Sequence, residues 1–182
     1  MTIAWLSGSS DPARSALSPA ERRFLDALAG ERSVVGSNFP WPQVSGAYRP
    51  VPLSVASVRN GVQFWRARWC SGYRRFTAAR VRGLLQACPG DLLIVTGSQG
   101  LELLRLAWPL LGAGATRIRV IALGPVAGRM PPDLRPFVVQ AGGDAVSRLG
   151  WRGPVDLRTT GGHLDYVHDL GLVDRLLPVA IR

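Results

Sequence analysis

Short runs of apolar residues alternate along the chain with amphipathic segments, and this alternation predicts the secondary structure. The apolar runs have the length of buried strands and are continuously hydrophobic. We expect strands at residues 2–6, 32–36, 91–96, 116–123, 136–140 and 154–159. Continuously apolar strands that alternate with helices are typical of a parallel sheet covered on both faces. The pattern therefore predicts an α/β fold with a mostly parallel central sheet and helices on both faces.

Helices are expected between these strands, where apolar residues recur at helical spacing. Ser18 is a clear helix start, because it is followed by Pro19 in the first turn and by Glu21 three residues later, which completes a capping box. Gly30 suits the C-cap of the same helix. Further helices are expected at residues 77–87, 101–114, 144–149 and 164–181.

Neither an internal repeat nor a linker divides the chain, so we expect a single domain over residues 1–182. A chain of 182 residues can bury a sizeable core, and a hydrophobic content of 47% excludes a disordered protein. One stretch departs from the regular alternation. Its prolines, which disfavour regular structure, are Pro40, Pro42, Pro50 and Pro52. We therefore expect an irregular basic and aromatic excursion at about residues 38–72.

The net charge of +10 is concentrated in one part of the sequence. Residues 32–90 contain no Asp or Glu. The arginines of this stretch are Arg32, Arg49, Arg59, Arg66, Arg68, Arg74, Arg75, Arg80 and Arg82. A one-sided basic surface attracts anionic partners. The alternative is an ordinary solvated surface that keeps the protein soluble.

The N-terminus and the cysteines bear on where the protein works. Residues 1–14 lack the basic start and the long apolar stretch of a signal peptide, and no run approaches the roughly 18 apolar residues of a membrane span. Cys70 and Cys88 are the only cysteines and have no metal-type spacing. We therefore expect free thiols in a cytoplasmic protein. With only two histidines, a zinc site is not expected, and neither is a cofactor.

One apolar strand runs directly into a serine. Residues 92–95 are followed by Thr96-Gly97-Ser98-Gln99-Gly100, and a helix is expected to begin there. A sharp strand-to-helix turn of small residues places its serine above the sheet edge, and the helix N-terminus behind it favours developing negative charge. This segment resembles the nucleophile turn of α/β-hydrolases, small-x-Ser-x-small, with Thr96 in place of the usual first glycine.

Two further polar residues follow the order of the same family. α/β-Hydrolases carry the serine first, then an acid after the next-but-one strand, then a histidine after the last strand. Here Asp144 follows the strand at 136–140 and His163 follows the strand at 154–159. The resemblance covers nearly the whole chain. It implies a minimal α/β-hydrolase-like fold with little or no cap, and a site at the carboxyl edge of the sheet.

The resemblance also implies a catalytic triad. His163 would take the proton from Ser98 and return it to the leaving group, while Asp144 would orient the imidazole and stabilise its charged form. Each residue also has a structural alternative. Ser98 could serve only as a turn or N-cap residue, and Asp144 could only cap the following helix. His163, preceded by two glycines, is harder to explain structurally, and His168 is interpreted as a surface or packing residue.

The family position of the oxyanion hole can be transferred to this sequence as well. The backbone N–H of Gln99 would supply one donor. The second donor would come from the loop after the first strand, at Gly8 or Ser9. Attack by Ser98 would then give an acyl-serine intermediate that water hydrolyses.

Arginines and aromatic residues interleave in the middle of the chain. The candidate substrate-binding residues among them are Trp65, Arg66, Arg68, Trp69, Arg74 and Arg75. Arg can fork onto phosphate and stack on aromatic rings, so the segment could form a small lid that grips an anionic acyl substrate, such as a coenzyme A or carrier-protein thioester or a phospholipid. Packing of the aromatic rings under arginine stems is the structural alternative. Nucleic acid is not the expected partner, because no recognised nucleic-acid motif occurs.

Our leading hypothesis is a serine hydrolase that acts on an ester or a thioester. Two rival hypotheses come from other classes. The first is a non-catalytic α/β-hydrolase-like module that binds an anionic partner through its Arg-rich face. The second is a binder of anionic lipid or nucleic acid, in which the Ser–Asp–His order is a coincidence.

Overall fold

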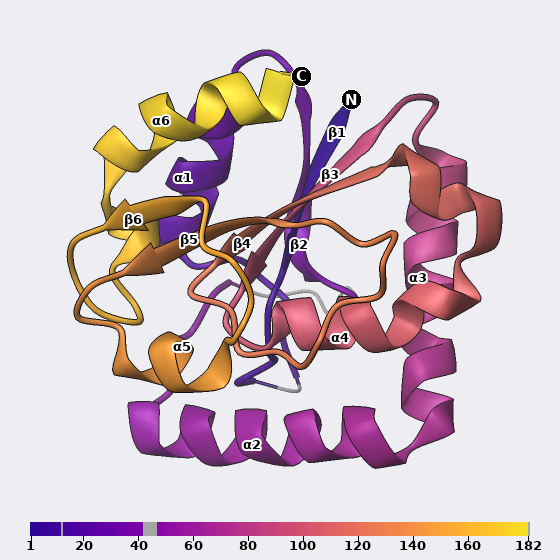
Figure 1. Cartoon of the computed structure of the whole chain (residues 1–182), viewed down its shortest axis with the longest axis horizontal. Coiled ribbons are helices and arrows are strands. Elements are labelled where there is room, and N and C mark those ends of the chain that lie inside the picture. The colour runs from indigo at the N-terminus through magenta and orange to yellow at the C-terminus, as the bar shows by residue number, and fades with distance from the viewer. Residues whose placement is uncertain (12, 42–46, 182) are drawn as a thin grey trace.

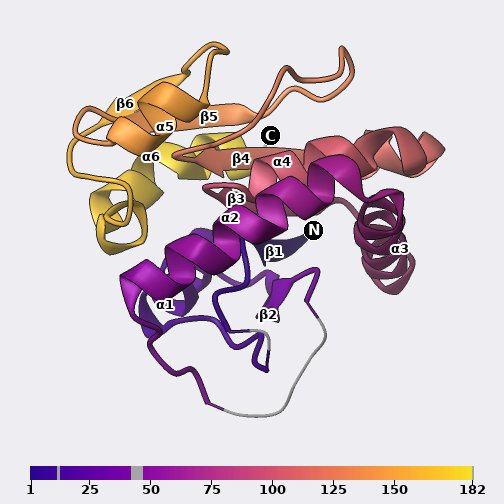
Figure 2. The ribbon, with the colours of Figure 1, turned by 90° about the horizontal axis from the view of Figure 1, so that it is seen from below.

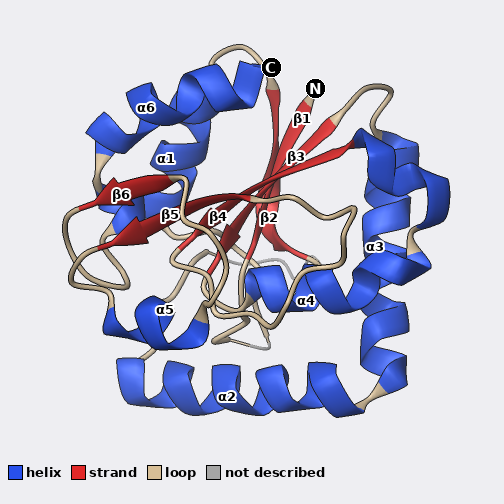
Figure 3. Cartoon of the chain, viewed as in Figure 1, coloured by secondary structure: helices blue, strands red, loops and turns tan. Residues whose placement is uncertain are grey.

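Six parallel strands form one sheet in the order β2-β1-β3-β4-β5-β6 (Figure 3). The structure, a computed structural model, describes residues 1–11, 13–41 and 47–181. The strands are β1 (Thr2–Leu6), β2 (Ser33–Phe39), β3 (Leu92–Gly97), β4 (Ile118–Leu123), β5 (Phe137–Ala141) and β6 (Leu157–Thr159). Every neighbouring pair runs parallel, which confirms the sheet expected from the apolar pattern. The direction of the strand order reverses between β1 and β3, so the loops after these two strands lie at the topological switch point.

Helices surround this sheet (Figure 1). They are α1 (Pro19–Ala29), α2 (Leu53–Trp69), α3 (Ser71–Ala87), α4 (Gly100–Ala107), α5 (Ala145–Gly150) and α6 (Leu170–Ile181). Three short 3₁₀ helices, η1 (Trp108–Leu110), η2 (Gly112–Arg117) and η3 (Tyr166–His168), complete the described elements.

The two faces of the sheet are covered by different helices, because successive side chains of a strand point to opposite sides. Ile3 and Trp5 of β1 pack in a core layer with α1 and α6. Ala4 and Leu6 pack in a second layer with α3 and α4. All four side chains are buried, which explains why the strand is continuously apolar. This is the α/β layout with helices on both faces that the sequence predicts.

The start of α1 confirms the predicted capping box. The Ser18 hydroxyl accepts a hydrogen bond from the Glu21 N–H at 3.2 Å, and the Glu21 carboxylate accepts one from the Ser18 N–H at 2.7 Å. Gly30 ends the helix with φ +58°, a conformation that glycine adopts without strain. Local sequence signals therefore define both ends of this helix.

The expectation of an irregular excursion at 38–72 is wrong for most of that stretch. Residues 53–69 form α2, and α3 begins at Ser71, six residues before the predicted 77. The prolines that suggested irregularity all precede these helices, and Pro52 stands at the N-cap of α2. Residues 33–39 extend strand β2 beyond its predicted end at 36. Residues 42–46 lie outside the described part of the chain.

Two other predicted helices are interrupted. The helix expected at 101–114 ends as α4 at Ala107 and continues as η1 and η2, because Pro109 has no N–H to donate to the preceding turn. The helix expected at 164–181 is divided at Asp169, whose ψ of 90° is not helical. Asp169 accepts a hydrogen bond from the Leu172 N–H at 3.1 Å and so caps the start of α6. His168 therefore lies exposed in the short 3₁₀ helix η3, before α6, and not inside one long terminal helix.

Candidate active site

The turn after β3 holds Ser98 in a strained backbone conformation. Ser98 has φ +50° and is the one non-glycine residue with a positive φ in the described chain. Its N–H donates to the Leu123 carbonyl at 3.2 Å, and its carbonyl accepts from the Val126 N–H at 3.0 Å. Such a conformation costs about 1–3 kcal/mol and persists only where surrounding contacts enforce it. The end of β4 and the loop after it hold the serine in this position.

The small residues around Ser98 are required by close backbone packing. A Cβ on Gly100 would lie 2.0 Å from the Leu6 carbonyl oxygen, and a Cβ on Gly97 would lie 2.8 Å from the Trp5 ring. Thr96 precedes the turn and lies buried within β3, with its hydroxyl 3.5 Å from the Ile121 carbonyl. The departure from the usual small residue at this position is therefore accommodated inside the sheet.

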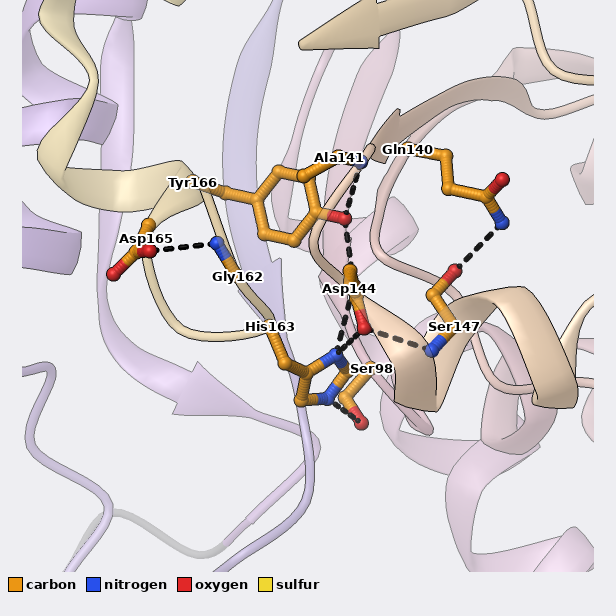
Figure 4. Close-up of polar contacts among 9 residues, drawn as sticks. All are labelled: Ser98, Gln140, Ala141, Asp144, Ser147, Gly162, His163, Asp165 and Tyr166. Atoms are coloured by element: carbon orange, nitrogen blue, oxygen red, sulfur yellow. Dashed lines mark hydrogen bonds and ion pairs between the residues drawn. The ribbon is translucent and has the colours of Figure 1, made fainter. Parts of the chain in front are cut away.

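Ser98, His163 and Asp144 form a continuous chain of hydrogen bonds (Figure 4). The Ser98 Oγ lies 2.9 Å from Nε2 of His163, and Nδ1 of His163 lies 2.9 Å from both carboxylate oxygens of Asp144. Because an ionised carboxylate only accepts hydrogen bonds, Nδ1 carries the hydrogen and Nε2 is left to accept from the serine hydroxyl. The three residues predicted from the loops after β3, β5 and β6 meet at the carboxyl edge of the sheet.

Asp144 is fully buried and its carboxylate has further partners. It accepts a hydrogen bond from the Ser147 N–H at 2.8 Å, so it also caps α5. The Tyr166 hydroxyl donates to it at 2.6 Å and accepts from the Ala141 N–H at 2.9 Å. Burial raises the pKa of Tyr166, and the adjacent Asp144 carboxylate raises it further, so the phenol stays a neutral donor. One side chain therefore both caps α5 and belongs to the hydrogen-bonded chain with His163 and Ser98.

The acid is enclosed by a glycine that the sequence does not single out. Gly124 follows β4 with φ +53°, and a Cβ there would lie 2.6 Å from both the Asp144 carboxylate and the Tyr166 ring. Glycine is needed for conformation and for space. Tyr166 was not predicted as part of the site, because it was interpreted as part of the terminal helix.

The loop after β1, where the second oxyanion donor is expected, is contacted by helix α2. The Ser9 N–H donates to the Gln63 side-chain oxygen at 2.9 Å, and the Gln63 amide nitrogen donates to the Ser9 carbonyl at 2.5 Å. The Gln99 amide also donates to the Gln63 oxygen at 3.3 Å. A Cβ on Gly8 would lie 2.1 Å from the Gln99 amide nitrogen and 2.4 Å from the Asn60 side-chain oxygen. Side chains of α2 therefore cover this loop, and Figure 2 shows the helix crossing this side of the sheet.

Within the described residues, none of the predicted substrate-binding side chains forms a hydrogen bond with Ser98, Asp144 or His163. Trp65 and Trp69 are exposed on α2, and so are Arg66 on α2 and Arg75 on α3. Arg74 donates to the carbonyls of Ala67 and Arg68, across the junction between the two helices. A role of these residues in substrate binding stays a prediction.

Arg68 instead belongs to an ion-pair network around the buried carboxylate of Glu102. Arg68 Nε lies 2.7 Å from Glu102, and Arg105 makes two contacts with it at 2.6 and 2.7 Å. The Gly128 N–H donates to the same carboxylate at 2.9 Å. Burial alone would raise the pKa of Glu102, but these hydrogen bonds and charges outweigh burial and lower it. The network joins α2, α4 and the loop after β4 behind the serine turn.

A cavity of about 500 Å³ lies beside the loop that follows β4. Its lining residues include Ala127, Met130 and Trp151, and neither Ser98, Asp144 nor His163 is among them. The same loop contains Val126, whose N–H donates a hydrogen bond to the Ser98 carbonyl. Cys70 is exposed and Cys88 is buried, both as free cysteines.

The described residues contain no cluster of three or more His, Cys, Asp or Glu side chains suited to hold a metal ion. Within the same residues, no helix is long and apolar enough to cross a membrane.

The sheet order, the strained serine turn and the positions of the acid and the histidine give the chain an α/β-hydrolase-like fold. It is similar to the crystal structure of a carboxylesterase from Mesorhizobium loti, with 18% identity, a TM-score of 0.49, and coverage of 97% of this chain and 88% of that one. A second solved chain, named m3DLH, is 15% identical with a TM-score of 0.52, over 100% of this chain and 84% of that one. Neither a family model nor a curated protein matches the sequence.

Proposed function

We propose that the protein is a serine hydrolase that cleaves an ester or a thioester through an acyl-Ser98 intermediate. The observation that carries the proposal is the hydrogen-bonded chain from Ser98 through His163 to the buried Asp144, placed on a strained strand-to-helix turn. A simple turn serine has no need of positive φ, nor of a histidine at 2.9 Å whose other nitrogen meets a buried carboxylate.

The chemistry follows from the direction of the hydrogen bonds. His163 Nε2 accepts the hydroxyl proton as Ser98 Oγ attacks the acyl carbon, and the same proton is then delivered to the leaving oxygen or sulfur. Asp144 stabilises the imidazolium through its bond to Nδ1–H and keeps the ring in the required tautomer. Water, activated by the neutral His163, then attacks the acyl-serine, which releases the acid and restores the Ser98 hydroxyl.

The oxyanion of the tetrahedral intermediate needs two donors. Gln99 follows the serine and stands at the N-cap of α4, where backbone N–H groups favour negative charge. Gly8 or Ser9 would supply the second N–H. The Ser9 N–H is bonded to Gln63 in this structure, so its use in catalysis requires the Gln63 side chain to move away.

A non-catalytic module that binds an anionic partner is the second candidate. The observation that favours it is the same Gln63 contact, which occupies a proposed oxyanion donor, together with exposed arginines such as Arg66 and Arg75 on the neighbouring helical surface. This candidate predicts salt-sensitive binding and no acyl transfer by Ser98.

Hydrolysis of a short-chain nitrophenyl ester by the wild type, Ser98→Ala and Ser71→Ala separates the two candidates. Ser71 is an exposed serine at the start of α3 and serves as the matched control. The serine hydrolase loses about 10³-fold or more of its turnover in Ser98→Ala and keeps it in Ser71→Ala. A folded wild type with no more turnover than Ser98→Ala would contradict the proposal.

A further inference from the structure

Helix α2 carries its apolar residues on the side that faces away from the protein. Val58, Val62, Trp65 and Trp69 recur at spacings of four, three and four residues, which places them on one face, and Val55 lies beside them. We call these five residues the outer stripe. Val58 is 68% exposed, Trp65 59% and Trp69 80%. Ala67, on the opposite side of the helix, is the one buried residue of α2.

Burial in the core does not explain this helix, because an ordinary surface helix turns its apolar face inward. Polar contacts attach α2 instead. Gln63 bonds to both backbone groups of Ser9, Arg59 donates to the Ser10 carbonyl at 2.6 Å, and Arg68 pairs with Glu102. A contiguous exposed apolar stripe of this kind indicates a binding surface for a protein, a membrane or a ligand.

We propose that the outer stripe of α2 binds the surface of an anionic lipid bilayer. Arg59 and Arg66 lie one residue after Val58 and Trp65 in the helix, so both arginines flank the stripe on the same side, and both are exposed. Residues 32–90 include no acidic side chain that would repel an anionic surface. A basic amphipathic helix with Trp on its apolar face lies in the plane of a membrane interface, with its apolar side chains among the headgroups and acyl chains.

The charge and the shape of the surface favour a bilayer over other occupants. A second copy of the chain would place two basic helices against each other, and their like charges would oppose the contact. Nucleic acid binding relies on arginines and on aromatic rings that stack with bases, whereas three of the five stripe residues are valines. A bilayer accommodates both the valines and the tryptophans, and it attracts the arginines.

Docking on this face would bring the serine site to the membrane surface. The inner side of α2 contacts Ser9 through Gln63, so the helix that meets the lipid is also the one that covers the loop after β1 (Figure 2). Membrane binding by α2 is a property beyond the proposed hydrolase activity and does not depend on that activity. Binding can be measured with Ser98→Ala, so a failure of catalysis and a failure of docking are separate results.

The test is co-sedimentation of the full chain with phosphatidylglycerol vesicles and with neutral phosphatidylcholine vesicles, at low and at high salt. We expect binding to the anionic vesicles that weakens with salt and is at least tenfold weaker for neutral ones. The double variant Trp65→Ser/Trp69→Ser should lose about tenfold or more in affinity. Arg66→Gln should lose about fivefold, since each arginine near an anionic surface contributes about that factor. Brominated lipid should quench the tryptophan emission of the wild type and do so less in Trp65→Phe/Trp69→Phe.

Leu149→Ser is the matched control, because Leu149 is 73% exposed on a different helix, α5, and this substitution should leave vesicle binding unchanged. Circular dichroism melts verify that each variant is folded. Equal binding to both kinds of vesicle, or undiminished binding by folded Trp65→Ser/Trp69→Ser, would overturn the proposal. So would a dimer without lipid that the same double variant dissociates, or binding to single-stranded DNA with none to vesicles.

Discussion

The Tyr166 hydroxyl donates a hydrogen bond to the Asp144 carboxylate at 2.6 Å, and the same carboxylate holds Nδ1 of His163. Tyr166 therefore positions the acid of the proposed triad, and its oxygen is fixed in turn by the Ala141 N–H. We expect Tyr166→Phe to lower kcat for a nitrophenyl ester by about tenfold and to leave KM nearly unchanged, since a hydrogen bond to a charged group contributes about 1.5–3 kcal/mol. Steady-state kinetics measures this directly.

Tyr73→Phe is the control for that substitution. Burial raises the pKa of Tyr73 to about 12, and within the described residues its hydroxyl is buried without a hydrogen-bond partner. Removing an unsatisfied buried hydroxyl is neutral or stabilising, so its kcat should match the wild type. Equal kcat values for the two tyrosine variants would show that the Tyr166 contact does not support catalysis.

Gln63 occupies the Ser9 N–H that the proposed mechanism assigns as an oxyanion donor. We expect Gln63→Ala to raise kcat/KM for a small soluble ester several-fold, because the donor no longer has to be freed from a competing acceptor. Gln86→Ala, at an exposed position on α3, is the matched control and should leave the rate unchanged. A drop in kcat/KM for Gln63→Ala in a folded protein would mean that the Gln63 side chain supports the site and does not block it.

Gly100 is required by the contact between the serine turn and β1. Because a Cβ there would lie 2.0 Å from the Leu6 carbonyl oxygen, Gly100→Ala should lower the free energy of unfolding by about 3 kcal/mol or more. Gly83→Ala places a methyl group in open space on α3, where it should stabilise the helix by about 0.5–1 kcal/mol. Urea denaturation of both variants measures these changes in the free energy of unfolding. Similar stabilities for both alanine variants would contradict the close packing of the turn.

Glu102 should make stability depend on acid pH. The pKa of the Glu102 carboxyl in the folded protein is lowered from the ordinary value near 4.5. The ionised carboxylate therefore contributes its full stabilisation of the folded state above that value, and this stabilisation is lost as the pH falls through the folded pKa. Glu102→Gln leaves Arg68 and Arg105 without their partner and should cost about 2–3 kcal/mol at pH 7.

The free energy of unfolding of the wild type should approach that of Glu102→Gln as the pH is lowered below about 4.5. Asp26→Asn, which breaks an exposed pair with Arg22, should change stability by less than about 1 kcal/mol and serves as the control. Chemical denaturation at several pH values measures both variants. A difference that stays constant down to pH 3 would contradict the lowered pKa.

The sheet could be predicted from the sequence because its strands are buried on both faces. Residues 3–6 and 92–95 are continuously apolar, and burial selects such residues wherever they stand in the sheet. Helix α2 could not be predicted in the same way. Its apolar stripe faces outward, no side chain caps its start, and the prolines before it suggested irregular structure. The usual signals of a surface helix are absent from it.

The candidate site was predictable as far as chain order defines it. Ser98, Asp144 and His163 each follow a strand, and parallel strands bring such residues to one edge of the sheet. Tyr166 and Gln63 act through tertiary contacts with partners 22 and 54 positions away in the sequence. No local pattern marks a residue for a contact of that kind, so these two emerged only from the structure.

The most direct test of the proposed triad is covalent labelling with a fluorophosphonate, followed by intact-mass and peptide mass spectrometry. A serine hydrolase with this geometry forms one adduct, on the peptide that contains Ser98, and the adduct is absent in Ser98→Ala and strongly slowed in His163→Ala. No adduct on the folded wild type, or an adduct that persists in Ser98→Ala, would contradict the proposed function.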